Sequence, residues 1–320
     1  MYHRYFRFAE EPFDVTPDPQ FFFASAQHTE AAASLYYSVI QRRGFAALIA
    51  APGLGKTSVV VSLLPRLRER AEVVFLVHPK LDADALLESV LQGLGINPDT
   101  ERSKRSQQLA EYLFELDRRN RSCVVILDEA QNLSFEALES VRMLSNYELP
   151  GRKLVQFILV GQPALGALLT RPECEQIRQR INIVARLQPL TPEYVAAYIE
   201  TRIRKAGGSG NPFTPEAIRT IAALSGGVPR VVNTLCFNAL GLAFADRSRV
   251  VTELHVSDAW ADLRLEAPDL AETVTAAASA SEFVTPPQGR TGFFEKLGEF
   301  AARNWRSVSR ALGLQAQRSN

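Results

Sequence analysis

Short apolar runs alternate with amphipathic segments over the first 190 residues of the chain. The apolar runs lie at residues 45–50, 73–77, 123–127, 154–160 and 183–187. Runs of this length, of which only 154–160 and 183–187 contain a polar residue, are typical of strands buried on both faces of a parallel sheet. Helical spacing of leucine and valine marks the segments at about 57–70, from Asp82 or Asp84 to 94, 106–119 and 135–146. The pattern predicts a doubly wound α/β domain over residues 26–190.

The pattern changes to helices alone after residue 190. Thr191-Pro192-Glu193 and Thr214-Pro215-Glu216 are matching helix starts, each with a capping residue, a proline in the first turn and an acid that the helix dipole favours. Two more helices are expected at about 231–246 and 252–265. These segments predict a small helical domain over residues 191–265.

The two ends of the chain differ from its body. Residues 1–25 are rich in aromatics and prolines, which predicts an extended arm that packs on the nucleotide domain, either sealing its core or lining a base pocket. Residues 266–290 read as a flexible linker. Residues 291–320 form a basic amphipathic stripe with a net charge of +3. A helix there would dock on the body, bind a partner or make a weak contact with a membrane surface.

A glycine loop follows the first apolar run. Glycines let backbone N–H groups converge on an anion at the positive end of the next helix. Lys56 would reach the β- and γ-phosphates of a nucleotide, and Thr57 would bind Mg²⁺. The usual pattern begins with a glycine where this chain has Ala50. The residues expected to bind the nucleotide are Pro52, Gly53, Leu54, Gly55, Lys56, Thr57 and Ser58.

Polar residues follow two later apolar runs. Asp128 and Glu129 come directly after residues 123–127, and Gln162 follows residues 154–160. Buried acids are costly unless they lie at the carboxyl edge of the sheet, where a metal ion and water are available. We expect Asp128 to hold Mg²⁺ through water, Glu129 to polarise the attacking water and Gln162 to sense the γ-phosphate. Together with the glycine loop, they predict ATP hydrolysis.

Composition limits the class of protein without naming a partner. The 320 residues are 46% hydrophobic, enough for a substantial core, and the net charge of +1 argues neither for nor against nucleic acid. Cys123, Cys174 and Cys236 lie far apart, which favours buried, reduced thiols. No apolar run approaches the ~18 residues that a membrane span needs. We expect a soluble, cytoplasmic protein.

Residues 1–265 resemble the AAA+ ATPases similar to ExeA and GspA of bacterial secretion systems, which are related to the transposition ATPases MuB and TniB. The motifs that carry the resemblance are Pro12-Phe13, Thr16-Pro17-Asp18-Pro19, Gly55-Lys56-Thr57, Leu127-Asp128-Glu129-Ala130-Gln131-Asn132-Leu133, Gly161-Gln162-Pro163, Arg178-Gln179-Arg180-Ile181 and Gly226-Gly227-Val228-Pro229-Arg230. Full-length members of this family carry a membrane span after the helical domain, and this sequence shows none there.

The resemblance implies a P-loop AAA+ core with sheet order 5-1-4-3-2, a helical lid and the cofactors ATP and Mg²⁺. It further implies that Arg230 touches the γ-phosphate from the lid. Either Arg178 or Arg180 would act as an arginine finger across a subunit interface, so a homo-oligomeric ring or filament is expected.

Three functions compete at this stage. The first is an ATPase that drives or regulates a protein complex of the secretion or export type. The second is a transposition regulator that forms a filament on duplex DNA and recruits a transposase. Its candidate DNA contacts are Lys80, Arg102, Lys104, Arg105, Arg118 and Arg119. The third, a scaffold that hydrolyses little, would need Glu129 to be misplaced.

Overall fold

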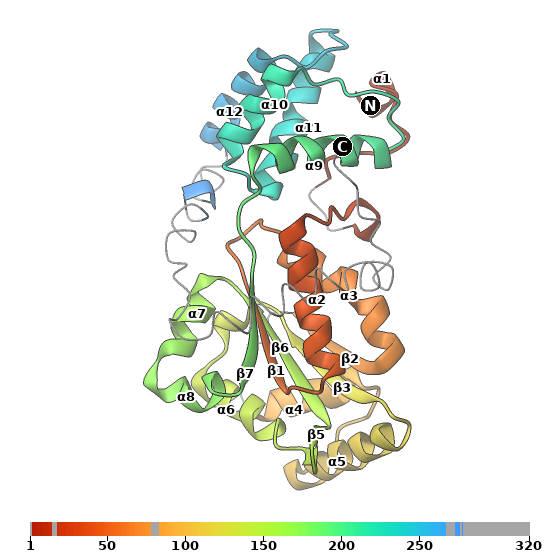
Figure 1. Cartoon of the computed structure of the whole chain (residues 1–320), viewed down its shortest axis with the longest axis vertical. Helices are drawn as coiled ribbons and strands as arrows, with labels where there is room; N and C mark the ends of the chain where they lie inside the picture. Colours follow the sequence, from red (N-terminus) through yellow and green to blue (C-terminus); the bar gives the residue numbers. More distant parts are fainter. Residues whose placement is uncertain (1, 15–17, 78–82, 267–272, 276, 278–320) are drawn as a thin grey trace. The chain divides into compact units, whose positions relative to one another are not determined.

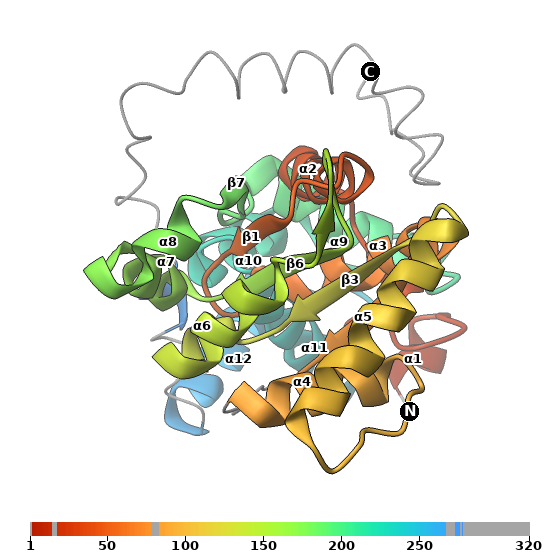
Figure 2. The same ribbon diagram turned by 90° about the horizontal axis from the view of Figure 1, so that it is seen from below.

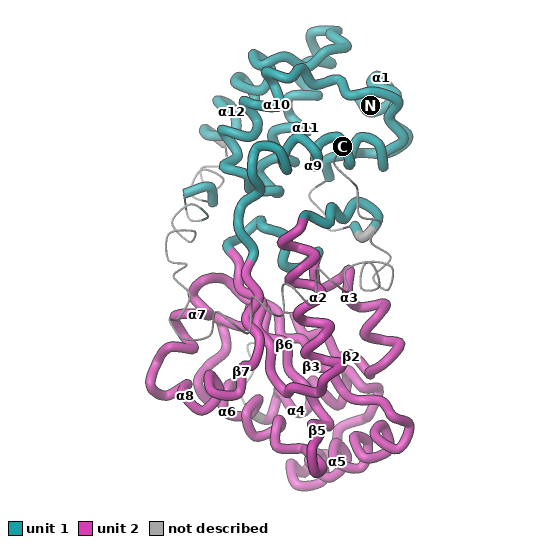
Figure 3. Tube along the Cα trace, in the orientation of Figure 1, with its two compact units in different colours: residues 1–25, 51–58, 187–287 teal, residues 26–50, 59–186, 288–320 magenta. Residues whose placement is uncertain are grey.

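The computed structural model describes residues 2–14, 18–77, 83–266, 273–275 and 277. These residues belong to two compact units, which Figure 3 colours separately. Of the described residues, those within 1–25, 51–58 and 187–277 belong to unit 1, and those within 26–50 and 59–186 belong to unit 2. The predictions for 291–320 and for most of the linker lie outside the described residues.

A parallel five-stranded sheet forms the centre of unit 2 (Figure 1). Its strands are β1 (Phe45–Ile49), β2 (Ala71–Leu76), β3 (Ser122–Leu127), β6 (Val155–Gly161) and β7 (Ile181–Arg186). Their order is β2-β3-β6-β1-β7, and the four pairings between neighbours are all parallel. Numbered along the chain, these strands have the order 5-1-4-3-2 read from the β7 edge, so the predicted sheet is confirmed.

Burial explains why these segments became strands. Every residue of β1, β3 and β6 is buried, whereas the edge strand β7 alternates buried and more exposed positions. Helix α2 (Ala26–Ile40) packs on β1 and β7. Helices α5 (Arg102–Arg118) and α6 (Phe135–Leu144) lie on the opposite face of the sheet from α2 (Figure 2). Unit 2 also contains α4 (Ala83–Gly93) and most of α3 (Lys56–Arg70).

Short elements escaped the sequence analysis. A hairpin of β4 (Glu148–Leu149) and β5 (Arg152–Lys153) precedes β6. Helices α7 (Pro163–Thr170) and α8 (Glu175–Arg178) lie between β6 and β7. Two-residue strands and a four-residue helix are too short to show a period in the sequence.

Asp117 connects the segments that lead into three neighbouring strands, β3, β6 and β1. Its side chain is 9% exposed and forms ion pairs with Arg42 (2.7 Å) and Arg152 (2.6 Å). Burial raises the pKa of the Asp117 carboxyl. The hydrogen bonds and positive charges of the two guanidinium groups lower this pKa by a larger amount, so the net shift is downward. A lowered folded-state pKa means that this carboxylate stabilises the fold above its unfolded pKa of about 3.9 and stops doing so as the pH falls through the folded value.

Replacing Asp117 with asparagine should therefore destabilise the protein by about 2 kcal/mol at neutral pH, because the two arginines lose a charged acceptor. The difference from the native protein should shrink as the pH falls below the unfolded pKa of about 3.9 and through the lowered folded-state pKa. Urea unfolding at neutral pH and over an acid series measures both quantities. Glu115→Gln is the matched control, because Glu115 pairs with Arg119 at the surface and should contribute under about 1 kcal/mol. An equal loss at neutral and at acid pH would rule out the ion pairs as the cause.

Four helices form the lid part of unit 1: α9 (Pro192–Lys205), α10 (Pro215–Ser225), α11 (Pro229–Ala245) and α12 (Glu253–Glu266). Helix α10 packs against the other three, and α11 also packs against α12. Thr214 caps α10 by accepting a hydrogen bond from the Ala217 N–H (3.1 Å), as the Thr-Pro-Glu motif predicts. Thr191 stands at the same position before α9, but its side chain makes no capping hydrogen bond. Among the described residues, no helix is long and apolar enough to cross a membrane.

The described residues of the N-terminal arm are held by lid helices. Tyr2 and Tyr5, from the short helix α1 (Tyr2–Tyr5), pack edge-on against Phe237 and Phe244 of α11. Buried Arg202 of α9 donates to the carbonyl oxygens of Pro12 and Asp14. We expected the nucleotide domain to support this arm, whereas these contacts all lie within unit 1.

Candidate functional site

The glycine loop lies in unit 1, between β1 and α3 in the chain. Gly53 and Gly55 have φ angles of +76° and +90°, a region that favours glycine. Lys56, the first residue of α3, is 7% exposed, and its Nζ donates to the Ala51 carbonyl oxygen (3.3 Å). Thr57 and Ser58 follow in the first turn, both half-buried. The ammonium group is thus held beside the loop backbone, at the positive end of a helix.

The loop also contacts the lid motif. The Arg230 N–H donates to the Gly53 carbonyl oxygen (3.3 Å), and a Cβ atom on Gly53 would lie 2.9 Å from the Val228 side chain. Gly227, in the same lid motif, is restricted by a different neighbour, because a Cβ there would lie 2.0 Å from the Leu190 carbonyl oxygen. Glycine at position 53 therefore permits the contact between the loop and the lid motif, and glycine at position 227 permits the contact with Leu190. These contacts explain why residues 51–58 belong to unit 1.

Ala50 stands just before the loop, at the position where the usual motif has a glycine. It is 3% exposed, and its N–H donates to the Gly161 carbonyl oxygen (3.1 Å). This bond extends the pairing of β1 with β6 by one residue. Alanine suits such a strand-like position, so the departure from the motif is compatible with the loop that follows.

The predicted acids lie at the carboxyl end of β3, in unit 2. Asp128 is 5% exposed, and its Oδ1 accepts a hydrogen bond from the Glu129 N–H (2.9 Å). Glu129 adopts the left-handed conformation, with φ at 51° and ψ at 38°. A residue with a side chain pays roughly 1–2 kcal/mol for this conformation, and such strain clusters at functional sites.

Amide groups hold the Glu129 carboxylate in place. Gln162 Nε2 donates to its Oε2 (3.1 Å), and Gln131 Nε2 donates to the same oxygen. Gln131 Oε1 in turn accepts from the Gln162 N–H (3.0 Å). Gly161 makes room for this contact, because a Cβ there would lie 2.7 Å from Gln131 Oε1. The structure therefore brings Glu129 and Gln162 together, as their strand-end positions suggested.

Sequence reasoning gave no role to Gln131. It stands two residues after Glu129 in the acidic motif, yet only the fold shows that its amide bridges the ends of β3 and β6. The sequence signal for this contact is the glycine before Gln162. Gly161 has no side chain, which leaves space for the amide of Gln131.

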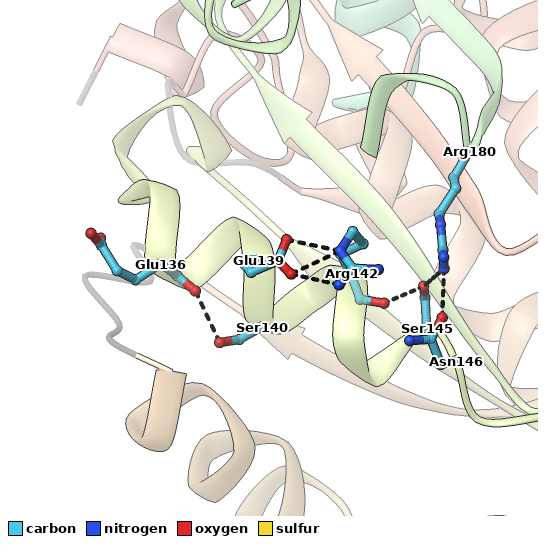
Figure 4. A network of polar contacts seen from close by, with 7 residues as sticks. All are labelled: Glu136, Glu139, Ser140, Arg142, Ser145, Asn146 and Arg180. Atoms are coloured by element: carbon cyan, nitrogen blue, oxygen red, sulfur yellow. Dashed lines mark hydrogen bonds and ion pairs between the residues drawn. The ribbon is translucent and has the colours of Figure 1, made fainter. Parts of the chain in front are cut away.

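The two candidate finger arginines have different surroundings (Figure 4). Arg180 donates to Ser145 Oγ (2.8 Å) and to Asn146 Oδ1 (2.8 Å), just beyond the end of α6. Arg178, the last residue of α8, is exposed. Among the described residues it makes no hydrogen bond or ion pair through its side chain. The polar network therefore holds Arg180 and leaves Arg178 available.

These residues fit a magnesium nucleotide in their donor chemistry. The loop offers backbone N–H groups, the Lys56 ammonium and the Thr57 hydroxyl, and a Cβ atom would obstruct it at Gly53. The end of β3 offers the carboxylate of Asp128, and the exposed Arg230 begins a lid helix at the loop. Mg²⁺ requires oxygen ligands. Phosphates bind to cationic side chains and N–H donors.

Comparison with known proteins identifies the family. Residues 39–169 match the family described as AAA domain. General secretion pathway protein A of Aeromonas hydrophila is 34% identical over 259 residues, which cover 80% of this chain and 47% of that protein. The RuvB subunit of the Holliday junction branch migration complex from Oleidesulfovibrio alaskensis is 27% identical over 67% of this chain and 60% of its own length. The chain thus spans about half the length of the secretion relative.

Solved structures show the same fold at low identity. The ORC2 protein of Aeropyrum pernix has a TM-score of 0.61 at 17% identity, covering 95% of this chain and 90% of its own. Cdc6p of Pyrobaculum aerophilum has a TM-score of 0.60 at 16% identity, covering 90% of each chain.

Proposed function

Because this chain is an AAA+ P-loop protein of the ExeA/GspA-like family, we propose that it is a Mg²⁺-dependent ATPase that works as a homo-oligomer. In this proposal, ATP turnover drives or regulates assembly of a larger protein complex of the secretion or export type. The secretion setting is inferred from general secretion pathway protein A, which this chain matches over 80% of its length.

Each residue has a distinct role in the proposed reaction. Residues 52–58 would bind the phosphates, with Lys56 supplying the positive charge and Thr57 a ligand for Mg²⁺. Asp128 would hold Mg²⁺ through water. Glu129 would accept a proton from the attacking water, and Gln162 would report on the γ-phosphate. Bound Mg²⁺ would neutralise the charge that develops on the phosphate oxygens.

The observation that carries this proposal is the arrangement around Glu129. A catalytic base needs a fixed position and a free lone pair. Two amides hold one carboxylate oxygen, Oε2, and the strained backbone fixes where the side chain starts. Among the described residues, no hydrogen bond or ion pair reaches the other oxygen, Oε1, so it is available to a water molecule.

Arg230 would couple nucleotide state to the lid. Its backbone is already bonded to Gly53. Its guanidinium group, at the first turn of α11, would bind the γ-phosphate. Loss of that phosphate would then remove a contact at the base of the lid, which is how hydrolysis would change the lid position.

We propose Arg178 as the finger that acts on the nucleotide of a neighbouring subunit. Arg180 is the weaker candidate, because its hydrogen bonds to Ser145 and Asn146 would have to break first. An arginine supplied in trans makes turnover depend on assembly, since a lone subunit lacks it. The specific ATPase rate should therefore rise with protein concentration.

Replacing Arg178 with alanine should remove that rise while leaving ATP binding intact. The specific ATPase rate is measured over a range of protein concentrations, and ATP binding is measured in parallel. Arg180→Ala is the matched control: it should retain the concentration dependence and lower the melting temperature instead. The opposite pattern would assign the finger to Arg180. A native rate that is independent of concentration would contradict the oligomeric ATPase itself.

A further inference from the structure

Basic residues gather at the amino edge of the sheet in unit 2, where the chain enters four of the five strands. The segments are 42–43 before β1, 66–72 at the start of β2, 115–121 before β3 and 148–153 before β6. Neighbouring strands in the order β2-β3-β6-β1 are parallel, so these four entries lie along one edge. We call these segments the amino-edge face.

The charge of this face exceeds that of the whole chain. Its segments contain ten basic and five acidic residues, a formal net charge of +5, whereas the complete sequence carries +1. Nine of the ten basic residues are arginines. Charge is therefore concentrated at one edge, a distribution that the overall balance hides.

The ion pairs at this edge leave positive charge uncompensated. Arg42 and Arg152 share the single carboxylate of Asp117. Arg118 and Arg119 likewise share Glu115. Lys153 pairs with Glu148, and Arg121 pairs with Glu72.

Three further arginines, Arg43, Arg68 and Arg70, are exposed, and among the described residues their side chains form no ion pair. Glu69, also exposed, lies between two of them in the sequence. The acids on this edge therefore leave its arginines in excess.

Helix dipoles account for part of this charge. Helices α2, α3, α5 and α6 end at this edge because each returns the chain toward the next strand. A helix carboxyl end carries about half a negative charge, so four of them offset about two positive charges. The remainder needs another partner.

We propose that the amino-edge face binds the phosphate backbone of double-stranded nucleic acid. Four strands at a spacing of about 4.8 Å span about 14 Å, a length over which duplex DNA carries about eight negative charges. Guanidinium groups match phosphate oxygens in two-pronged geometry, and here they project from the ends of rigid helices and strands. Such contacts favour phosphates without reading the base sequence.

A membrane surface fits the face less well. Attachment to lipid depends on buried apolar area as well as on charge. In these segments and the five residues before each of them, the large apolar side chains that are exposed are Ile40 (41%), Phe114 (45%) and Met143 (53%), which stand on three different helices. Three separate side chains offer little area for insertion, so phosphates of a duplex are the better partner.

The test is binding of the full chain to a short, fluorescent DNA duplex of random sequence, without nucleotide, measured by anisotropy between about 50 and 200 mM salt. The variant combines Arg68→Glu and Arg70→Glu. We expect it to weaken binding about tenfold or more and to make the slope of log K against log salt shallower by about two. A milder pair, Arg68→Gln with Arg70→Gln, should show a smaller loss of affinity in the same direction. It tests the same two arginines if the charge-reversed variant fails to fold.

The matched control combines Arg102→Glu and Lys104→Glu, which change the net charge by the same amount. Both were candidate DNA contacts from sequence, but they lie outside the amino-edge face and pair with Asp84 and Glu101. These residues begin the 17-residue helix α5, whose other end lies at the amino-edge face, about 24 Å away. We expect this control to bind within about twofold of the native chain. An equal or larger loss in the control, or no duplex binding by the native chain, would overturn the proposal.

Two other readouts complete the design. Vesicles that contain phosphatidylserine should not compete with the duplex, and binding to vesicles but not to DNA would assign the face to a membrane instead. The basal ATPase rate should be the same in all variants, because none of these residues belongs to the proposed nucleotide site. Failure of DNA binding would leave the proposed ATPase standing, since binding is measured without nucleotide.

Discussion

Replacement of Lys56 with alanine should abolish ATP binding. The Lys56 ammonium group is nearly buried beside the glycine loop, where it would contact two phosphates. Each charged hydrogen bond contributes about 1.5–3 kcal/mol, so removing both should cost at least about 3 kcal/mol. That corresponds to a loss in affinity of at least about a hundredfold. Titration with a fluorescent ATP analogue in the presence of Mg²⁺ measures the effect.

Thermal unfolding gives an independent readout of the same prediction. A ligand at about 100 times its Kd stabilises the native state by about 2.7 kcal/mol, so ATP should raise the melting temperature of the native protein. The Lys56→Ala protein should lose this rise and otherwise melt as a folded domain. Lys104→Ala is the control, because Lys104 is an exposed lysine of α5 that pairs with Glu101. Undiminished stabilisation of the Lys56 variant by ATP would show that the loop does not bind phosphates.

Much of the fold could be predicted because its signals are local. Most buried positions of the five strands are apolar side chains that form short runs in the sequence, as in residues 123–127, although Ser122 of β3 and Gln156 of β6 are buried as well. Parallel pairing follows from the helices between them, and the Thr-Pro-Glu motif marks where α10 starts because its cap is made within one turn. The sheet order came from family resemblance, since local patterns do not specify which strands become neighbours.

The contacts that shape the candidate site were beyond such reasoning. Gly53 is hydrogen-bonded to a lid residue about 175 positions later in the chain. Gln131 is hydrogen-bonded to Gln162, just beyond the ends of the neighbouring strands β3 and β6. Nothing periodic marks either pair. The sequence also left the choice between Arg178 and Arg180 open. The choice depends on Ser145 and Asn146, which accept hydrogen bonds from the Arg180 guanidinium group and not from Arg178.

Exchange of Glu129 for glutamine should keep ATP binding and lower turnover by roughly a hundredfold to ten-thousandfold, the usual contribution of a general base. The substitution preserves the shape of the side chain. Its remaining carbonyl oxygen can still accept the hydrogen bonds that Gln131 and Gln162 now donate to Glu129. What disappears is the negative charge and the ability to take a proton from water. Single-turnover hydrolysis, measured beside ATP affinity, separates these two effects.

The consequences for assembly make this variant decisive. If hydrolysis releases the contact between subunits, protein that binds ATP without hydrolysing it should accumulate as the oligomer, which sedimentation would show. Glu136→Gln removes an equal charge from an exposed position in the first turn of α6 and should hydrolyse ATP normally. Normal turnover by the Glu129 variant would mean that the strained backbone and paired amides serve only to fix the end of β3, and the catalytic base would have to be sought elsewhere.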